Sequence, residues 1–253
     1  MLHRIEELEG FTIHAKDGEI GSVEDAFFDD EKWVVRYLVV RTGSWLFGKE
    51  VLISPVSVKE IDWHGHKVET DLSAEEVKNS PSVEMEKPIS KQQEYEFNRY
   101  FGIPVYWGGA GLWGNAMYPG AIFIPPEEHA EELEEMKKRY NHHLRSVVEV
   151  RRYRIDTRDD ELGRVEDFII DDDTMAVRYM EIKTGGLFDG KHVLVSPRWI
   201  ENVNWGEEEV RVNLTTEKIK DAPEYDPTHP NDRAHEDRRA EEYGSAKYWL
   251  EEG

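Results

Sequence analysis

One segment of this sequence occurs twice, and this repeat constrains the fold more than any other feature. Residues 20–30 read IGSVEDAFFDD and residues 162–172 read LGRVEDFIIDD, so each position has a counterpart 142 residues later. The same spacing joins further pairs, among them Tyr37 with Tyr179, Thr42 with Thr184, Pro55 with Pro197, and Trp107 with Trp249. A fixed period sustained over this length indicates two copies of one structural unit in the chain.

Short runs of β-branched and aromatic residues predict that each copy is mainly β. Residues 33–41, WVVRYLVVR, form the strongest run and predict a buried central strand. The strands predicted for the first copy are residues 11–15, 21–28, 33–41, 51–53, 58–63 and 67–71. Six short strands with no long helix between them predict a small β-barrel, in which closure of the sheet protects its edges.

Capping signals predict short helical arms after the strands. Ser73 is followed by Glu76 in the pattern of a capping box, and Ser90 is the predicted N-cap of a second helix. Beyond Pro125 and Pro126, glutamates spaced four residues before basic residues predict a charged linker helix. The predicted domains are a first barrel at 1–83, a helical arm with an aromatic tip at 84–107, a loop and linker helix at 108–143, a second barrel at 144–225 and a C-terminal arm at 226–253.

These motifs resemble the PRC-barrel domain family. The resemblance is carried by residues 21–25, 33–46 and 51–55 in the first copy and by 163–167, 177–186 and 193–197 in the second. That family is named for the cytoplasmic domain of the photosynthetic reaction-centre H subunit. The resemblance implies a fold class of two tandem PRC-like barrels related by a pseudo-two-fold repeat. Its motifs are turn glycines and core strands, so it implies a fold more than an activity.

The acid excess disfavours one class of partner. The chain has 54 Asp and Glu against 32 Lys and Arg, giving a formal net charge of −22. Such a charge repels nucleic-acid phosphates and anionic headgroups, so we expect no nucleic-acid partner and no membrane contact. The sequence has no cysteine, which excludes disulfides and thiolate chemistry. Its first residues lack the pattern of a signal peptide, and we expect a cytoplasmic location.

Two segments have the spacing of a phosphate-binding loop without its mechanism. In residues 43–49 and 185–191, glycines precede a lysine, but Glu50 and His192 then stand where a serine or threonine would hold magnesium. A strand is predicted to follow each segment, whereas phosphate binding needs a helix N-terminus. We interpret both segments as glycine-bounded connections between strands.

Other candidate sites are incomplete. The acidic turns at 29–31 and 171–173 could gather a hard cation, but they lack the ligand spacing of an EF-hand. His64 and His66 could face one side of a turn, yet no third ligand can be named. No serine, histidine and aspartate are placed like a triad. We therefore expect no catalytic residue, no metal and no other cofactor.

An acidic pair lies inside each copy of the repeat. Because neighbouring residues of a strand face opposite sides, one carboxylate of each pair is expected to point inward. A buried carboxylate needs a cationic partner, and an arginine on the next strand can supply one. We predict structural ion pairs within this set: Glu24, Asp25 and Arg36 in the first copy, and Glu166, Asp167 and Arg178 in the second.

The segment at 108–143 has no counterpart in the repeat, and we expect function there. Residues 100–126 carry no charge, but their glycines and prolines would break a membrane helix, so they predict a loop packed on protein. The candidate partner-binding residues are Tyr106, Trp107, Leu112, Trp113, Tyr118 and Phe123.

The sequence as a whole predicts a soluble, non-catalytic protein-binding or scaffold module. Its partner is expected to be another protein, and association with a second copy of the chain is an alternative. Two other functions stay open. One is a regulatory or electron-transfer-associated subunit related to the photosynthetic reaction centre, which the family resemblance alone suggests. The other is a ligand carrier or enzyme with a pocket between the two barrels.

Overall fold

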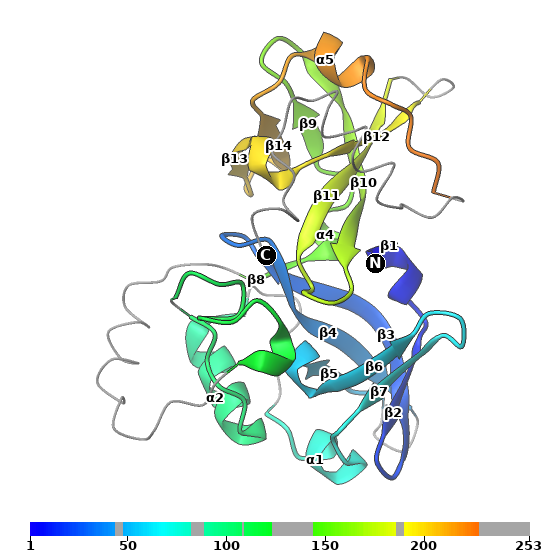
Figure 1. The fold of residues 1–253 in the computed structure, drawn as a ribbon, viewed down its shortest axis with the longest axis vertical. Helices are drawn as coiled ribbons and strands as arrows, with labels where there is room; N and C mark the ends of the chain where they lie inside the picture. Colours follow the sequence, from blue (N-terminus) through cyan, green and yellow to red (C-terminus); the bar gives the residue numbers. More distant parts are fainter. Residues whose placement is uncertain (44–47, 82–88, 108, 123–143, 186–189, 228–253) are drawn as a thin grey trace. The chain divides into compact units, whose positions relative to one another are not determined.

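The chain forms two seven-stranded sheets, each built mainly from one copy of the repeat, in the computed structural model (Figure 1). The structure describes residues 1–43, 48–81, 89–107, 109–122, 144–185 and 190–227. The chain divides into two units. The N-terminal unit comprises Glu7–Ser146 and Asp173–Ala176, and the C-terminal unit comprises Met1–Glu6, Val147–Asp172 and Val177–Gly253.

The sheet of the N-terminal unit has the strand order β5-β4-β3-β2-β7-β6, with β8 paired to the end of β3. The β2–β7 pair is parallel, and the other pairs of this sheet are antiparallel. Its strands are β2 (Thr12–Ala15), β3 (Gly18–Asp29), β4 (Val34–Thr42), β5 (Glu50–Ile53), β6 (Val58–Asp62), β7 (Lys67–Thr70) and β8 (Leu144–Ser146). The six strands predicted for the first copy are confirmed, with ends shifted by three residues at most.

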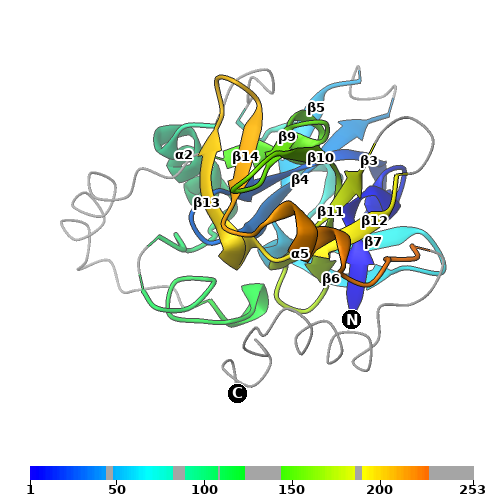
Figure 2. The ribbon, with the colours of Figure 1, turned by 90° about the horizontal axis from the view of Figure 1, so that it is seen from above.

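The sheet of the C-terminal unit repeats this order as β12-β11-β10-β9-β14-β13, with β1 paired to the end of β10. Its strands are β1 (Leu2–Arg4), β9 (Arg154–Asp156), β10 (Glu161–Asp171), β11 (Val177–Thr184), β12 (His192–Val195), β13 (Ile200–Asn204) and β14 (Glu209–Val212). Figure 2 shows β13 and β14 as a neighbouring pair within this unit. The fold is therefore mainly β, with two tandem copies, as predicted.

The seventh strand of each sheet comes from the other copy of the repeat. Leu2, at the start of the chain, lies opposite Asp171 of β10, while its counterpart Leu144 lies opposite Asp29 of β3. The two short strands are thus exchanged between the copies. The predicted domain boundaries at residues 1 and 144 do not include this exchange.

The repeated glycine near the start of the long strand has a steric cause. A Cβ atom on Gly21 would lie 2.0 Å from the carbonyl oxygen of Arg41, and one on Gly163 would lie 2.0 Å from that of Lys183. Only glycine allows the paired strands to approach this closely. Two residues further on, at Val23 and Val165, the register of each long strand shifts by a β-bulge.

Helices are short and follow the strands. They are η1 (Ile5–Leu8), α1 (Ala74–Lys78), α2 (Lys91–Phe101), α4 (Val147–Val150) and α5 (Thr216–Lys220), with further 3-10 turns η3 (Pro55–Ser57), η4 (Pro119–Ala121) and η6 (Pro197–Trp199). The predicted caps are confirmed, because Ser73 and Ser90 each form a capping box at the start of α1 and α2. No helix of the described ranges is long and apolar enough to span a membrane.

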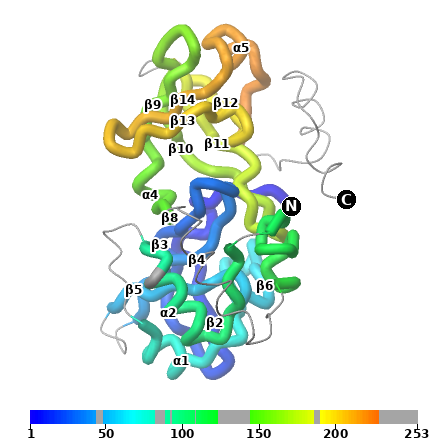
Figure 3. The backbone as a smooth tube through the Cα atoms, turned by 90° about the vertical axis from the view of Figure 1, so that its left-hand side faces the viewer, coloured from blue at the N-terminus to red at the C-terminus, as the bar shows by residue number. Residues whose placement is uncertain are grey.

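Helix α2 packs on the sheet of its own unit (Figure 3). Phe97 joins a buried cluster with Phe27, Tyr37 and Leu52 from β3, β4 and β5. The predicted first arm therefore covers the sheet of its own unit. The predicted linker helix, the C-terminal arm beyond residue 227 and the candidate Phe123 lie outside the described residues.

Candidate functional site

The described partner-binding candidates fall into a buried and an exposed group. Tyr106, Trp107 and Trp113 are buried, with Trp113 only 1% exposed. Leu112 is half-buried, and Tyr118 is 53% exposed. The three buried side chains are thus anchors of the segment, and Tyr118 is the candidate that offers a surface group.

Arg36 is the residue around which this segment is anchored. Its guanidinium carbon lies 3.8 Å from the ring centre of Tyr106 and 4.6 Å from that of Trp113, so two aromatic rings flank the charge. Its Nε donates to Asp29 at 2.7 Å, and both side chains of this ion pair are almost fully buried. Its Nη1 has no hydrogen-bond partner. The rings therefore replace part of the solvation that the guanidinium loses on burial.

Two further contacts dock residues 109–113 on the same unit. The Lys32 ammonium donates to the carbonyl oxygens of Gly109, at 3.2 Å, and Gly111. The Trp113 indole N–H donates to the carbonyl of Thr174 at 2.9 Å. Burial lowers the pKa of Lys32, and the charge of Arg36 lowers it further. The uncharged segment is thus held through its backbone carbonyls and its aromatic side chains.

A buried carboxylate on α2 joins the segment to the sheet. Glu94 is 1% exposed and accepts hydrogen bonds from the hydroxyls of Tyr37, at 3.3 Å, and Tyr106. The Tyr37 hydroxyl also lies 3.0 Å from Oδ1 of Asn98. Burial, together with the negative charge of Glu94, raises the pKa of both tyrosines well above the ordinary value. Both phenols therefore stay protonated as donors.

The first acidic pair has other partners than the one predicted. Glu24 pairs with Arg41 at the surface, and Asp25 accepts a hydrogen bond from the Ser146 hydroxyl. Arg36 pairs with Asp29 instead. The bulge between Val23 and Asp25 is the physical reason, because an extra residue in the strand changes the directions of the side chains that follow it.

The second acidic pair leads into a buried charge cluster in the C-terminal unit. Asp167 is fully buried and lies 2.9 Å from Nη2 of Arg151 and 3.4 Å from Nε of Arg4. Arg4 also lies 2.8 Å from Glu181, and Glu181 lies 2.5 Å from Nδ1 of His192. Burial raises the pKa of Asp167 to about 6 and outweighs the opposing attraction of Arg151. Asp167 is thus the buried carboxylate of this pair, and its cationic partners are Arg151 and Arg4 instead of Arg178.

Arg178 and Glu166, the remaining members of the predicted set, lie outside this cluster. Nη2 of Arg178 lies 3.3 Å from Asp171, which repeats the pairing of Arg36 with Asp29. Glu166 is half-buried and forms no ion pair within the described residues. The arginine of each copy thus pairs with the last residue of the preceding strand.

Four residues of the C-terminal charge cluster were missed in the sequence: Arg4, Arg151, Glu181 and His192. Glu181, His192 and Arg4 occupy the positions that hold Val39, Glu50 and Ser146 in the other sheet, and only the last pair lies in the exchanged strands. The signal available was the difference between the copies, because a valine replaced by a glutamate inside a buried strand requires a buried cation nearby.

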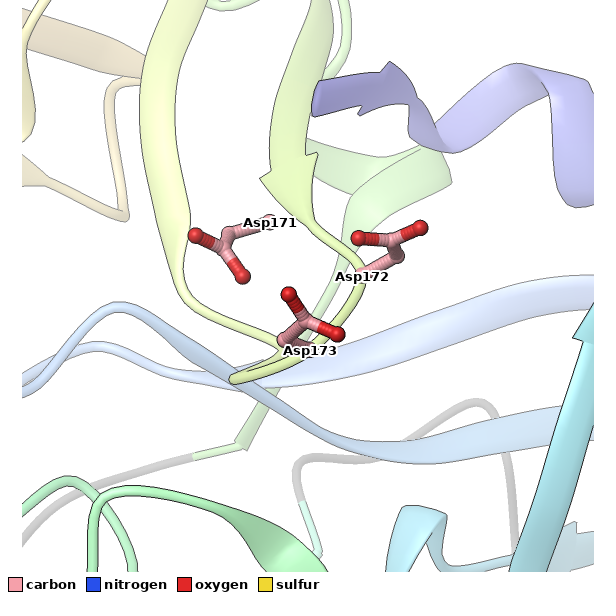
Figure 4. A group of neighbouring side chains, drawn as sticks. All are labelled: Asp171, Asp172 and Asp173. Carbon is pink, nitrogen blue, oxygen red and sulfur yellow. The ribbon is translucent and has the colours of Figure 1, made fainter. Parts of the chain in front are cut away.

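Three consecutive aspartates lie around the turn after β10 (Figure 4). One carboxylate oxygen from each of Asp171, Asp172 and Asp173 lies within 4.8 Å of the others. Asp171 already pairs with Arg178, and Asp172 pairs with the amino group of Met1 and lies 3.4 Å from His3. Burial alone would raise the pKa of Asp172, but its hydrogen bonds from these two groups lower it. The negative charges of Asp171 and Asp172 are thus compensated by groups of the protein itself.

The lysines of the two phosphate-loop-like segments have structural partners. Nζ of Lys49 donates to the carbonyl of Ser80 at 3.2 Å, and Nζ of Lys191 donates to that of Lys220 at 2.8 Å. Each lysine therefore binds a carbonyl at or just after the end of the short helix α1 or α5. His66 stacks on Phe11 with ring centres 5.0 Å apart, which gives this histidine a packing role in the turn.

The chain matches the family model of the PRC-barrel domain over residues 2–77 and again over residues 149–219. Together the two matches cover more than half of the sequence, and the chain belongs to the PRC-barrel domain family. A comparison with curated proteins gives no match.

Proposed function

We propose that this chain is a cytoplasmic, non-catalytic module that binds another protein through the outer face of residues 109–122. The observation that supports the proposal is the anchoring of this segment. Trp113 is buried against the Arg36 guanidinium, and Lys32 donates to the carbonyl of Gly109, while Tyr118 is 53% exposed. An aromatic side chain presented by a fixed backbone loses little conformational freedom on binding, and tyrosine is enriched at interface hot spots.

The position of Tyr118 strengthens this proposal. It precedes the turn η4, which packs against η3 of the same unit, so its backbone is supported from the sheet. A net charge of −22 favours a partner whose contact surface is basic. A scaffold module needs such a fixed contact surface but no catalytic site.

The test compares two exposed tyrosines of the same unit. The Tyr118→Ser variant and the matched Tyr100→Ser variant are used as baits in native lysate, and captured proteins are identified by mass spectrometry. Tyr100 is 42% exposed on α2, outside the proposed surface. We expect Tyr118→Ser to lose partners that wild type and Tyr100→Ser retain. Equal capture by all three baits would rule out this surface.

A further inference from the structure

The exposed face of the C-terminal sheet carries a row of three cationic side chains. In the strand register, Lys183 of β11 lies opposite Arg164 of β10, and Arg164 lies opposite Arg154 of β9. Residues that are directly opposite each other point to the same face, and neighbouring strands are about 5 Å apart. Lys183 and Arg164 are exposed, and the Arg154 side chain is 40% exposed.

Among the described residues, two members of this row have no carboxylate partner. Arg154 has acidic neighbours, at 3.3 Å from Glu209 and 3.9 Å from Glu161. Arg164 donates to the carbonyl of Arg152 at 2.9 Å, and in the part of the chain that the structure describes neither Arg164 nor Lys183 forms an ion pair. Like charges directly opposite each other on neighbouring strands destabilise a sheet. The repulsion within the row is therefore offset by carboxylates only at Arg154, as far as the described residues show.

The N-terminal sheet shows that the fold does not require this row. The counterparts of Lys183, Arg164 and Arg154 are Arg41, Ser22 and Thr12. Arg41 is neutralised by Glu24 and by Glu50, the latter at 3.2 Å. The counterpart of Glu50 is His192, which is engaged by Glu181. In one unit this part of the sheet holds a cation paired with two carboxylates, and in the other it holds two cations that form no ion pair with any described residue.

We propose that Lys183, Arg164 and Arg154 bind a short acidic segment of another protein in an extended conformation. Alternate side chains of an extended segment lie on one side about 7 Å apart, a spacing that the long side chains of the row can match with two carboxylates. Charge-assisted hydrogen bonds from arginine and lysine to carboxylates are the strong ones. The net charge of −22 repels long polyanions, which favours a short acidic segment over nucleic acid.

This inference rests on the proposed protein-binding function but concerns a different unit from Tyr118. The test is fluorescence anisotropy of the full chain with a labelled peptide that carries aspartate at alternate positions, compared with the same peptide carrying asparagine. We expect binding of the aspartate peptide only, and loss of that binding at about 1 M salt, where the Debye length is about 3 Å.

Three variants locate the binding. The Lys183→Gln/Arg164→Gln double variant is expected to bind at least about tenfold more weakly, since it removes two charge-assisted contacts. Arg164→Lys keeps the charge and retains most of the affinity, and Arg41→Gln, the matched change on the other sheet, binds like wild type. All of these positions are exposed, so the variants are expected to fold, which circular dichroism checks.

Several results would overturn the inference. These are equal binding of the asparagine peptide, equal binding by the double variant, no binding by the wild-type chain, or tighter binding of a single-stranded oligonucleotide of equal charge. None of them alters the expected difference between Tyr118→Ser and Tyr100→Ser, so failure here is distinguishable from failure of the proposed function.

Discussion

The two units share one sheet plan but differ in the charges that they bury. In the N-terminal unit, Arg36 is held by one carboxylate and two aromatic rings. In the C-terminal unit, Asp167 and Glu181 share Arg4, and a second arginine and a histidine complete the cluster. The glycines, bulges and strand order are the same in both.

This difference separates what the fold needs from what each copy adds. The close approach of strands at Gly21 and Gly163 is needed in both copies, so glycine is present in both. Val39 and Glu181 occupy the same position in the two copies, and the backbone there does not require one residue type. A buried carboxylate is acceptable at such a position wherever a cation can reach it. In the C-terminal unit Arg4 supplies that cation from the exchanged strand β1.

Each unit contains an arginine–aspartate pair at the same position of its sheet, and breaking this pair is expected to have the largest effect on stability. Asp29→Ala leaves the Arg36 charge buried and unpaired, which is expected to lower the free energy of unfolding by about 3–5 kcal/mol. The matched Asp171→Ala is expected to cost about 1–2 kcal/mol, because the Asp171 side chain is 18% exposed and water can replace it. Guanidinium titration of both variants measures the difference. Equal losses would contradict the unequal burial of the two pairs.

The next effect is the pH dependence that Asp167 gives to the C-terminal unit. Its pKa is raised from 3.8 to about 6 in the folded protein, so its contribution to stability is full below pH 4 and is lost as the pH rises through 6. Two pKa units correspond to about 3 kcal/mol. The stability of Asp167→Asn relative to wild type should therefore rise by up to that amount between about pH 4 and pH 7. Urea titrations across this range measure it.

The control for this prediction is Asp25→Asn in the N-terminal unit, at the same position of the bulge. Asp25 is only half-buried and faces a serine hydroxyl. A pH dependence of the same size in Asp25→Asn would show that burial at Asp167 is not the cause.

The smallest expected effect is on the helix caps, where the units differ least. Ser73→Ala removes the N-cap of α1 and Thr215→Ala removes that of α5, and each is expected to cost about 1 kcal/mol. Ser73→Ala should cost slightly more, since the Ser73 hydroxyl also donates a hydrogen bond to the Glu76 carboxylate at 2.7 Å, and alanine cannot. Thermal unfolding of both variants checks this order. A larger loss at Thr215 would contradict the contribution of the capping box.

Much of the fold could be predicted because its signals are local. Alternating and β-branched runs marked the strands, and Ser73 and Ser90 marked the caps. The partners of Arg36 could not be predicted, since a single bulge at Glu24 changes which carboxylate reaches the guanidinium. The packing of residues 100–126 on protein was predicted, but not which aromatic side chains are buried, because anchors such as Tyr106 and Trp113 and an exposed residue such as Tyr118 have similar local sequences.

The strand exchange was missed for a different reason. Strands β1 and β8 have three residues each, too few for a pattern, and their sequences Leu2-His3-Arg4 and Leu144-Arg145-Ser146 are counterparts in the repeat. Either strand could pair with either sheet by hydrophobic pattern alone. What favours the observed pairing is the charge cluster, since β1 has Arg4 at the third position, beside Glu181 and Asp167, where β8 has Ser146.

The exchange is the central claim about this molecule, and cross-linking tests it most directly. The chain has no cysteine, so pairs can be introduced without background. His3 lies opposite Ile170 in β10, whereas without exchange it would lie opposite Phe28, the residue that Arg145 now faces. Directly opposite residues of antiparallel strands are close enough for a disulfide. We expect His3→Cys/Ile170→Cys to form an intrachain disulfide on oxidation and His3→Cys/Phe28→Cys to form none. The reverse result would contradict the exchange.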